Sequence, residues 1–267
     1  MNNKRIALYG AGKLGTLITN ALIKGFLPEY ELIAVYSRSA AKAEKLAESV
    51  NKAELGFECK PVKTQEELLQ MPLDYIIEAA SPKAMKTLTI PALKKGISLI
   101  CLSIGAFADQ EFYQEAGNVA KRNKARIHFA SGAIGGFDVL QTASLMGDCK
   151  VSFSTEKGPE SLKNTSVYNK ELKENKRVVF SGNAKEAIAA FPTKVNVAVA
   201  ASLASVGPEN EKVAITSVPY YIGDKHTIRI NNEQVDAEIS IYSKTAEIAG
   251  WSVVTILRNL NSPFVFG

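Results

Sequence analysis

The amino-acid sequence predicts an α/β protein with two domains, in which a doubly wound parallel sheet precedes an α+β domain with a mixed sheet. Two observations indicate this division. Short apolar runs alternate with helical segments up to about residue 130, and beyond residue 131 strand-like segments follow one another more directly. The expected domains are residues 1–130 and 131–244, and a C-terminal helix within 245–267 is expected to pack back on the first domain.

The first half of the chain has the pattern of β-α repeats. Residues 13–24 place Leu, Ile and Ala at helical spacing, and Gly25 follows as a typical C-cap residue. Ser81 and Pro82 are typical of an N-cap and a first helical position. The apolar runs are continuous, as expected of strands buried on both faces of a parallel sheet. Strands are expected at 6–9, 32–36, 58–62, 75–79, 98–103 and 126–130, and helices at 13–24, 40–50, 65–70, from 81, and at 110–123.

The second half starts with a glycine-rich segment, Ser131–Gly136, that precedes a predicted helix at 137–145. Strand-like segments then dominate, and two successive ones near the end are separated by Asn231 and Asn232, residues typical of a turn. Such neighbouring strands are expected to pair antiparallel. Strands are expected at 151–155, 178–181, 213–218, 227–230 and 237–242, and helices at 184–190, 195–205 and 245–260.

The composition narrows the class of protein. Of 267 residues, 46% are hydrophobic and 22% charged, as in an ordinary globular protein. The net charge is only +5 and the lysines are scattered, which argues against nucleic-acid binding. No run of about 18 apolar residues predicts a membrane helix, and the N-terminal segment lacks the features of a signal peptide. Three distant cysteines without a C-x-x-C pair favour a reducing compartment and disfavour a metal site, so the cytoplasm is expected.

A glycine loop connects the first expected strand to the first helix. Gly10, Gly12 and Gly15 form G-x-G-x-x-G in the strand–turn–helix context that the motif requires. The first glycine permits the tight turn, the second lets the backbone approach a pyrophosphate, and the third allows close packing of the helix. The free N–H groups and the positive dipole end of the helix favour phosphates. The sequence therefore predicts a Rossmann domain that binds a dinucleotide.

The end of the second expected strand bears on the kind of dinucleotide. NAD-specific sites commonly carry Asp or Glu here, whereas this chain has Ser37, Arg38 and Ser39. Because Arg pairs well with phosphate, NADP is favoured over NAD, with use of both left open; the alternative is that Arg38 is only solvated. The predicted cofactor contacts are Gly10, Gly12, Lys13, Leu14, Gly15, Ser37, Arg38, Ser39, Ala80, Ser81, Ser103, Ala133 and Asn196.

Four segments, in order along nearly the whole chain, resemble the L-aspartate dehydrogenase family. E-A-A-S-P and S-I-G-A-F-A-D, within Glu78–Asp109, resemble the family's E-A-A-S-P and S-V-G-A-L-A-D. S-G-A-I-G-G-F-D from Ser131 resembles S-G-A-I-G-G-L-D, F-P-T-K-V-N-V-A from Phe191 resembles F-P-x-N-x-N-V-A-A, and D-K-H-T-I from Asp224 resembles N-x-H-E-I. The resemblance implies a Rossmann domain for NAD or NADP and a second domain with the substrate pocket and much of a homodimer interface. It also implies oxidation of L-aspartate to iminoaspartate, then oxaloacetate and ammonia, and the imine can feed NAD biosynthesis through quinolinate.

The resemblance places the catalytic histidine at His226. Independently, a histidine with a near-neutral pKa suits both proton abstraction at an amino carbon and activation of water for imine hydrolysis. The chain has two histidines, and His128 lies in an expected buried strand, where a structural role is expected. His226 lies where an expected loop meets a strand. His226 is therefore the predicted general acid and base.

The segment Ser131–Gly136 is predicted to wrap the substrate, because glycines expose N–H groups that bind carboxylates; the alternative is a flexible interdomain hinge. A second carboxylate would be held by Lys157, Lys194 or Lys225, although each such lysine is more often solvated. The predicted substrate contacts are Ser131, Gly132, Ala133, Gly135, Gly136, Lys157 and Asn196.

Departures from the family pattern leave the substrate open. Asp224 stands where the family has Asn, Thr227 where it has Glu, and Lys194 at the first Asn of N-x-N-V. An oxidoreductase acting on another amino or keto dicarboxylate is therefore the first alternative. A non-catalytic dinucleotide-binding redox regulator is the second, and His226 together with S-G-A-I-G-G argues against it.

Overall fold

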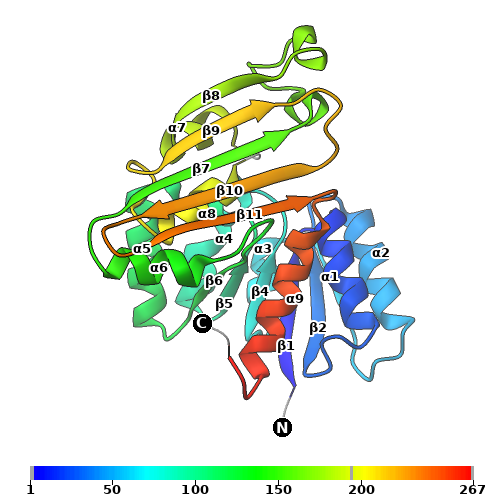
Figure 1. Cartoon of the computed structure of the whole chain (residues 1–267). Coiled ribbons are helices and arrows are strands. Elements are labelled where there is room, and N and C mark those ends of the chain that lie inside the picture. Colours follow the sequence, from blue (N-terminus) through cyan, green and yellow to red (C-terminus); the bar gives the residue numbers. More distant parts are fainter. Residues whose placement is uncertain (1–2, 193–194, 266–267) are drawn as a thin grey trace. The chain divides into compact units, whose positions relative to one another are not determined.

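The computed structural model describes residues 3–192 and 195–265. These residues form two compact units. The first unit comprises residues 3–106, 110–130 and 249–265, and the second comprises residues 107–109, 131–192 and 195–248. Each unit has a β-sheet of its own (Figure 1).

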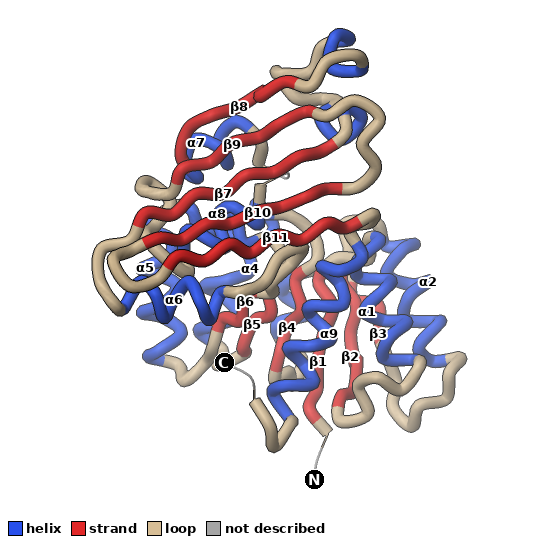
Figure 2. Tube along the Cα trace, in the orientation of Figure 1, coloured by secondary structure: helices blue, strands red, loops and turns tan. Residues whose placement is uncertain are grey.

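The first unit contains a six-stranded sheet in the order β3-β2-β1-β4-β5-β6 (Figure 2). All neighbouring strands pair parallel, which confirms the predicted doubly wound sheet. The strand order reverses at β1, so the carboxyl ends of β1, β2 and β4 lie at one point on the same edge, where ligands bind in such folds. The strands are β1 (Lys4–Tyr9), β2 (Tyr30–Tyr36), β3 (Lys60–Val62), β4 (Tyr75–Glu78), β5 (Ser98–Cys101) and β6 (Ile127–Phe129).

Helices connect these strands and cover the sheet. Ser81 caps the helix that it opens, because its hydroxyl accepts a hydrogen bond from the Ala84 N–H at 3.2 Å, with Pro82 in the first position. The helices of this unit are α1 (Lys13–Ile23), α2 (Ala40–Asn51), α3 (Gln65–Leu69), α4 (Pro82–Lys94), α5 (Gln110–Arg122) and α9 (Glu247–Asn261), and a 3₁₀ helix, Ile104–Ala108, follows β5.

Helix α9 joins the core of the first unit although it follows the second unit in sequence. Val253 and Leu257 are buried in the same cluster as Ile6 and Ile18. The Tyr30 hydroxyl donates a 2.7 Å hydrogen bond to the backbone carbonyl of Leu257. The core of the first unit is therefore built from segments on both sides of the second unit in sequence.

The second unit contains a five-stranded mixed sheet in the order β11-β10-β7-β9-β8. Strands β7 and β9 pair parallel, whereas the other neighbours, including the predicted hairpin β10–β11, pair antiparallel. The strands are β7 (Lys150–Lys157), β8 (Arg177–Asn183), β9 (Lys212–Ser217), β10 (Asp224–Asn231) and β11 (Asp236–Ser243). The helices are α6 (Phe137–Leu145), α7 (Ala184–Ala190) and α8 (Asn196–Leu203), with 3₁₀ helices at Pro159–Leu162 and Lys170–Lys173.

One face of this second sheet changes from apolar to polar along its strands. Phe153 on β7 is directly beside Ile228 on β10 and belongs to the core of the unit. Two residues further along β7, in the same pleat orientation, Thr155 is beside His226. The end of this buried face therefore carries polar side chains, which the packing of an apolar core does not explain.

Several expected boundaries differ from the structure. Strand β10 begins at Asp224 rather than at residue 227, so His226 lies within the strand and not at its junction with a loop. Two other differences have a clear local cause. The strand expected at 58–62 begins only at Lys60, because the side-chain amide of Asn51 bonds both backbone groups of Cys59 in place of a neighbouring strand. Strand β10 extends through Asn231, and Asn232 closes the turn because its Oδ1 accepts the N–H of Val235 at 2.7 Å.

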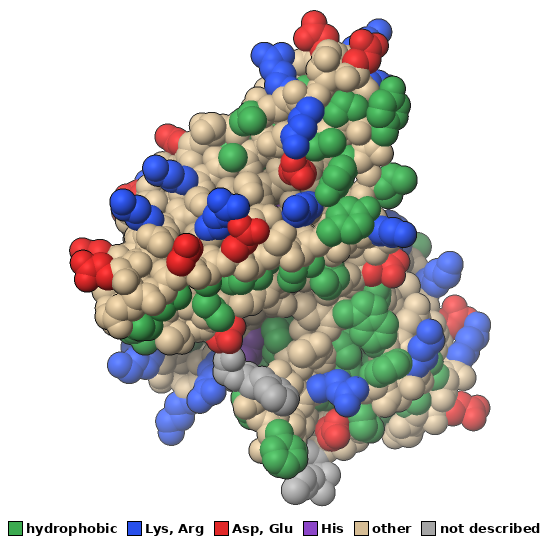
Figure 3. Space-filling view, in the orientation of Figure 1, with side chains coloured by type: hydrophobic (Ala, Val, Ile, Leu, Met, Phe, Trp, Pro, Cys, Tyr) green, Lys and Arg blue, Asp and Glu red, His purple; other side chains and the backbone are tan. Residues whose placement is uncertain are grey.

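Two broader observations concern the described residues. Within 3–192 and 195–265, no helix is both long and apolar enough to cross a membrane. On the face drawn in Figure 3, cationic and anionic side chains are interspersed rather than gathered by sign.

Candidate active site

A cavity of about 460 Å³ lies at the carboxyl ends of β1, β2 and β4 in the first unit. It is built from the loops that follow these strands and from the first turns of α2 and α4. Its lining consists of Tyr9, Gly10, Ala11, Gly12, Tyr36, Ser37, Arg38, Ser39, Lys42, Ala79, Ala80, Ser81, Lys83, Ala84 and Thr87. Seven of the predicted cofactor contacts thus line one cavity: Gly10, Gly12, Ser37, Arg38, Ser39, Ala80 and Ser81.

The glycine loop has the geometry that a bound pyrophosphate needs. Gly10 has φ 122°, and a Cβ there would lie 2.6 Å from the carbonyl oxygen of Ala79. A Cβ on Gly15 would collide with the Gly10 carbonyl, so the third glycine lets α1 start directly on the loop. A Cβ on Gly12 would meet no atom within 4 Å, so this position faces open space. Helix α1 has no side-chain cap and no acidic residue in its first turn, which leaves its N–H groups available to an anion.

The connections that follow β2 and β4 contribute three cations to the lining of this cavity. Arg38 follows β2, Lys42 lies on the first turn of α2, and Lys83 follows Pro82 on α4, and all three are exposed. The lining includes no Asp or Glu. This part of the site therefore suits an additional phosphate. Sequence reasoning missed Lys42 and Lys83; the position of Lys42 on the first turn of the helix after Arg38 is a signal that could have found it.

Glu78 holds the two loops that carry Ala80, Ser81 and Ser103. Its buried carboxylate accepts hydrogen bonds from the N–H groups of Ala80 (2.8 Å), Ser81 (2.9 Å) and Ser103 (2.9 Å), and from the Ser103 hydroxyl (2.8 Å). Burial raises the pKa of Glu78, and these donors oppose the rise. Sequence reasoning did not assign a role to Glu78, although it lies at the carboxyl end of a buried strand, where such residues position ligand loops.

The remaining predicted cofactor contacts lie elsewhere. Lys13 and Leu14 are on the first turn of α1 and do not line the cavity. Ser103 is not part of the lining and is hydrogen-bonded to Glu78. Ala133 and Asn196 belong to the second unit, in the glycine-rich segment and at the start of α8.

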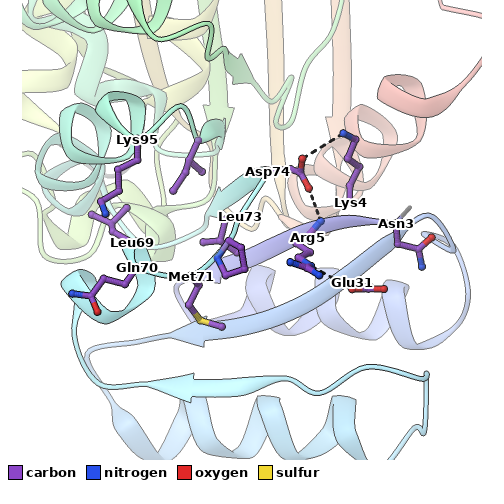
Figure 4. A pocket seen from close by; sticks show the side chains of 12 residues that line it. Asn3, Lys4, Arg5, Glu31, Leu69, Gln70, Met71, Leu73, Asp74 and Lys95 are labelled. Carbon is purple, nitrogen blue, oxygen red and sulfur yellow. Dashed lines mark hydrogen bonds and ion pairs between the residues drawn. The ribbon is translucent and has the colours of Figure 1, made fainter. Parts of the chain in front are cut away.

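A larger cavity, of about 880 Å³, lies at the opposite, amino-terminal edge of the first sheet (Figure 4). Its charged groups compensate one another: Asp74 accepts hydrogen bonds from the Lys4 ammonium (3.4 Å) and the Arg5 backbone N–H (2.8 Å), and Arg5 pairs with Glu31 at 4.0 Å. Ligands of doubly wound sheets bind at the carboxyl edge. The smaller cavity is therefore the candidate site for a dinucleotide.

In the second unit, His226 lies on β10 with its ring buried against Phe153. The two ring centroids are 5.6 Å apart and the planes are inclined by 26°. The residue is 5% exposed, and Nδ1 has no hydrogen-bond partner among the described residues. Burial and, secondly, Lys157 lower the pKa of His226 from 6.5 to about 4, while Asp224 opposes them. The imidazole is therefore neutral at physiological pH, with a lone pair available to accept a proton.

Lys157 and Asp224 form an ion pair beside this histidine. They are directly opposite on β7 and β10, and Lys157 Nζ lies 3.7 Å from Asp224 Oδ2. The lysine side chain is only 4% exposed, so the solvated alternative for Lys157 is wrong. Lys225 is adjacent to His226 in sequence and points to the other face of the sheet, away from the cluster. Lys194 lies outside the described residues.

The glycine-rich segment Ser131–Gly136 lies beside α8 and β11. A Cβ on Gly132 would contact Val197 at 4.0 Å, and one on Gly136, which has φ 75° and starts α6, would lie 2.5 Å from Ile239 Cδ1. Apart from the buried Ile134, the segment is half-buried. Its predicted substrate contacts, Ser131, Gly132, Ala133, Gly135 and Gly136, therefore form one continuous backbone stretch near Asn196, which opens α8.

The other histidine and two of the cysteines are shielded from solvent to different degrees. His128 is half-buried on the edge strand β6, 6.1 Å from the ring of Tyr75, so the expected full burial is wrong because β6 has only one neighbouring strand. Burial raises the pKa of Cys59 to about 12 and that of Cys101 well above its usual value. Within the described part of the chain, no group of three or more His, Cys, Asp or Glu side chains is placed to hold a metal.

Comparisons with known proteins cover both units. A family profile described as "Aspartate dehydrogenase, C-terminal" matches residues 138–260, and one described as "Homoserine dehydrogenase, NAD binding domain" matches residues 10–130. The L-aspartate dehydrogenase of Methanosarcina acetivorans is 34% identical, over 98% of this chain and 99% of the relative. The solved structure of an aspartate dehydrogenase from Thermotoga maritima is 29% identical, with a TM-score of 0.79 over 99% of this chain and 100% of that one.

A hyperthermophilic archaeal homoserine dehydrogenase in complex with NADPH has the same fold, with a TM-score of 0.65 and 16% identity over 99% of this chain and 100% of that one. The parallel sheet, the glycine loop and the cavity beside it thus define a nicotinamide-dinucleotide-dependent oxidoreductase. Together with the relatives above, the match to the second unit shows that the chain belongs to the aspartate dehydrogenase family.

Proposed function

We propose that this chain catalyses the oxidative deamination of L-aspartate to iminoaspartate, which hydrolyses to oxaloacetate and ammonia, and the reverse reductive amination. The observation that carries the proposal is the buried, neutral imidazole of His226 beside the buried ammonium of Lys157. A proton acceptor and a cation for a carboxylate therefore share one cluster. The relatives named L-aspartate dehydrogenase support the choice of substrate.

His226 is the proposed general base and acid. Oxidation of the amine removes a hydride from Cα and a proton from nitrogen, and leaves a C=N bond. The bound dinucleotide supplies the hydride acceptor. His226 accepts the proton, and its depressed pKa favours return of that proton when water adds to the imine and ammonia leaves. The reverse reaction uses the same groups in the opposite order.

The proposed cofactor is NADP, with NAD as an alternative ligand of the same cavity. Ser37, Arg38 and Ser39 would hold the 2′-phosphate, and Lys42 would add a charge. The absence of an acidic side chain from the cavity lining supports this preference, because a carboxylate there would repel the phosphate. Gly10, Gly12, Lys13, Leu14 and Gly15 would hold the pyrophosphate, and Ala80, Ser81, Ser103, Ala133 and Asn196 are proposed contacts to the rest of the cofactor.

The proposed substrate contacts come from the second unit. Backbone N–H groups of Ser131–Gly136 would bind one carboxylate, with Asn196 as a neutral donor. Lys157 would attract the other carboxylate, since it carries a charge in a buried place. We also propose that the protein works as a homodimer, and light scattering after size-exclusion chromatography tests this separately.

The decisive experiment measures reduction of NADP⁺ and NAD⁺ at 340 nm with a panel of L- and D-amino acids. We expect selective turnover of L-aspartate, and ammonia and oxaloacetate as products. Selective turnover of another amino dicarboxylate would replace L-aspartate as the substrate. Absence of any turnover, with the dinucleotide still bound, would overturn the proposed activity and favour a binding protein that responds to the cofactor.

A further inference from the structure

The polar end of the buried sheet face in the second unit contains several polar groups beside His226 that the proton transfer does not use. Across β9, β7 and β10, Ser217, Lys157 and Asp224 stand directly beside one another. One pleat further into the unit, Thr155 on β7 stands beside His226. Directly paired residues on one face have Cβ atoms about 4.5–5.5 Å apart, so all five side chains belong to one cluster.

Two hydroxyls in this cluster are buried without a hydrogen-bond partner among the described residues. They are Ser217 Oγ and Thr155 Oγ1, and the two residues are 0% and 1% exposed. His226 Nδ1 is in the same situation. A buried polar group without a partner is unfavourable, so several of them together indicate that another group completes the cluster. These atoms flank Lys157, and the group that they suit is an anion with several acceptor oxygens.

The ion pair between Lys157 and Asp224 is loose. Their closest N–O distance is 3.7 Å, whereas a direct charge-assisted hydrogen bond measures about 2.7–2.9 Å. The side chain of Asp224 is 37% exposed, while that of Lys157 is 4% exposed. Asp224 can therefore turn towards water at little cost, and Lys157 cannot.

The backbone holds Asp224 at this position. Gly223 has φ 81°, and a Cβ there would lie 2.7 Å from Lys244 Cα and collide with the Ser243 carbonyl. The strand that carries Asp224 thus starts from a close contact with the end of β11, and the backbone of Asp224 has a defined place opposite Lys157. The arrangement is a property of the fold rather than of a free loop.

We propose that the Lys157–Asp224 pair is a carboxylate-exchange site, in which a carboxylate of the substrate replaces Asp224 beside Lys157 and accepts hydrogen bonds from Ser217 and Thr155. Asp224 pairs with the lysine when no substrate is present and leaves towards solvent when the substrate binds. The pair therefore selects anionic substrates, and Asp224 competes with them. This inference rests on the proposed function only for the size of the ligand, a four-carbon dicarboxylate.

The test uses succinate, a four-carbon dicarboxylate without an amine, so that binding is measured without turnover. Calorimetric titration of the full-length protein saturated with NADPH gives its Kd. We expect Lys157→Met to weaken succinate binding at least about tenfold and Ser217→Ala to weaken it about threefold. We expect Asp224→Asn to strengthen it about threefold, because a competing carboxylate has been removed.

Matched variants control for charge and for the strand. Lys225→Met removes a lysine next to His226 on the opposite face, and Asp236→Asn removes a carboxylate at the far end of β11. Both should leave the Kd of succinate within about twofold. NADPH titration and thermal melting of each variant report whether it is folded.

The sign of the Asp224→Asn effect decides the inference, even if Lys157→Met does not fold. Tighter binding supports exchange. Unchanged or weaker binding overturns it, because a purely structural ion pair predicts no gain when one partner is neutralised. If succinate follows the expected pattern and L-aspartate is not oxidised, the exchange site stands and the proposed function falls. If L-aspartate is oxidised and these substitutions do not change the Kd of succinate, the proposed function stands and the exchange site is overturned.

Discussion

The two units present their functional groups in different ways. In the first unit, the groups proposed to bind the dinucleotide belong largely to the backbone: a glycine loop, the N-terminus of α1, which has no side-chain cap, and loops held by the Glu78 carboxylate. The second unit uses side chains on three strands, which only the strand register brings together. Backbone sites leave a contiguous motif in the sequence, whereas sites built across strands leave scattered residues. The predictions below test this contrast.

The largest effect is expected at His226. His226→Ala removes the proposed proton acceptor, and kcat/KM for L-aspartate should fall about 10²–10⁴-fold. NADPH affinity should change little, because the dinucleotide cavity lies in the first unit. Steady-state kinetics measure the change in kcat/KM, and a fluorescence titration with NADPH measures the affinity for the dinucleotide. His128→Ala is the control, and a near-normal rate in the His226 variant would remove this residue from the mechanism.

The glycine loop offers a comparison within the first unit. Gly15→Ala should lower both the melting temperature and NADPH affinity, because its Cβ collides with the Gly10 carbonyl. Gly12→Ala should keep the melting temperature and lose NADPH affinity, about tenfold or more, since its Cβ has room in the protein but occupies the approach of a pyrophosphate. Gly117→Ala on α5, where a Cβ also meets nothing within 4 Å, is the control. Equal losses at Gly12 and Gly117 would contradict the assigned phosphate position.

Arg38 should separate the two dinucleotides. Arg38→Ala should raise the Kd of NADPH about tenfold and that of NADH less than about twofold, because only NADPH carries the 2′-phosphate. Fluorescence titrations with each dinucleotide measure the ratio. Lys42→Ala should also raise the Kd of NADPH more than that of NADH, but by a smaller factor than Arg38→Ala. If both Kd values change equally, Arg38 does not read the phosphate.

The smallest expected effect concerns the pH dependence of stability. In the unfolded chain His226 titrates near 6.5, whereas burial lowers its pKa in the folded protein to about 4. Its contribution to stability is therefore complete above pH 6.5 and is lost as the pH falls towards 4, since only the unfolded state gains the proton there. Between these values the wild-type melting temperature should fall more steeply than that of His226→Asn.

The same pKa can be observed directly. The chain has two histidines, so the imidazole C–H region of an NMR spectrum is simple, and His128→Gln identifies the remaining signal. We expect the His226 signal to titrate near pH 4. Titration at or above pH 6.5 would mean that the imidazole is not buried as described.

The sequence predicts the two units to different extents, because one site is built mainly from the backbone and the other from side chains on several strands. The alternation of strands and helices in the first unit, the glycine loop and the bounds of α6 and α7 are predicted well, because each depends on residues that are neighbours in sequence. Arg38 is placed in the cavity for the same reason. These features need no knowledge of which strands pair.

The polar cluster of the second unit is predicted only in part. His226 was found through its resemblance to a family pattern, and Lys157 was one of three candidate lysines. Thr155 and Ser217 were missed, because their role depends on β7 lying between β9 and β10. The alternation of Val151, Phe153, Thr155 and Lys157 on β7 marks one buried face, but it does not reveal which residues of other strands share that face.

Helix α9 has a consequence for the order of events during synthesis. The helix supplies Val253 and Leu257 to the first unit's core, and Tyr30 bonds its backbone. A ribosome makes residues 131–248 before it makes this helix. Synthesis of the first unit thus begins before that of the second unit and ends after it. The second unit therefore has its whole sequence available for folding before the sequence of the first unit is complete.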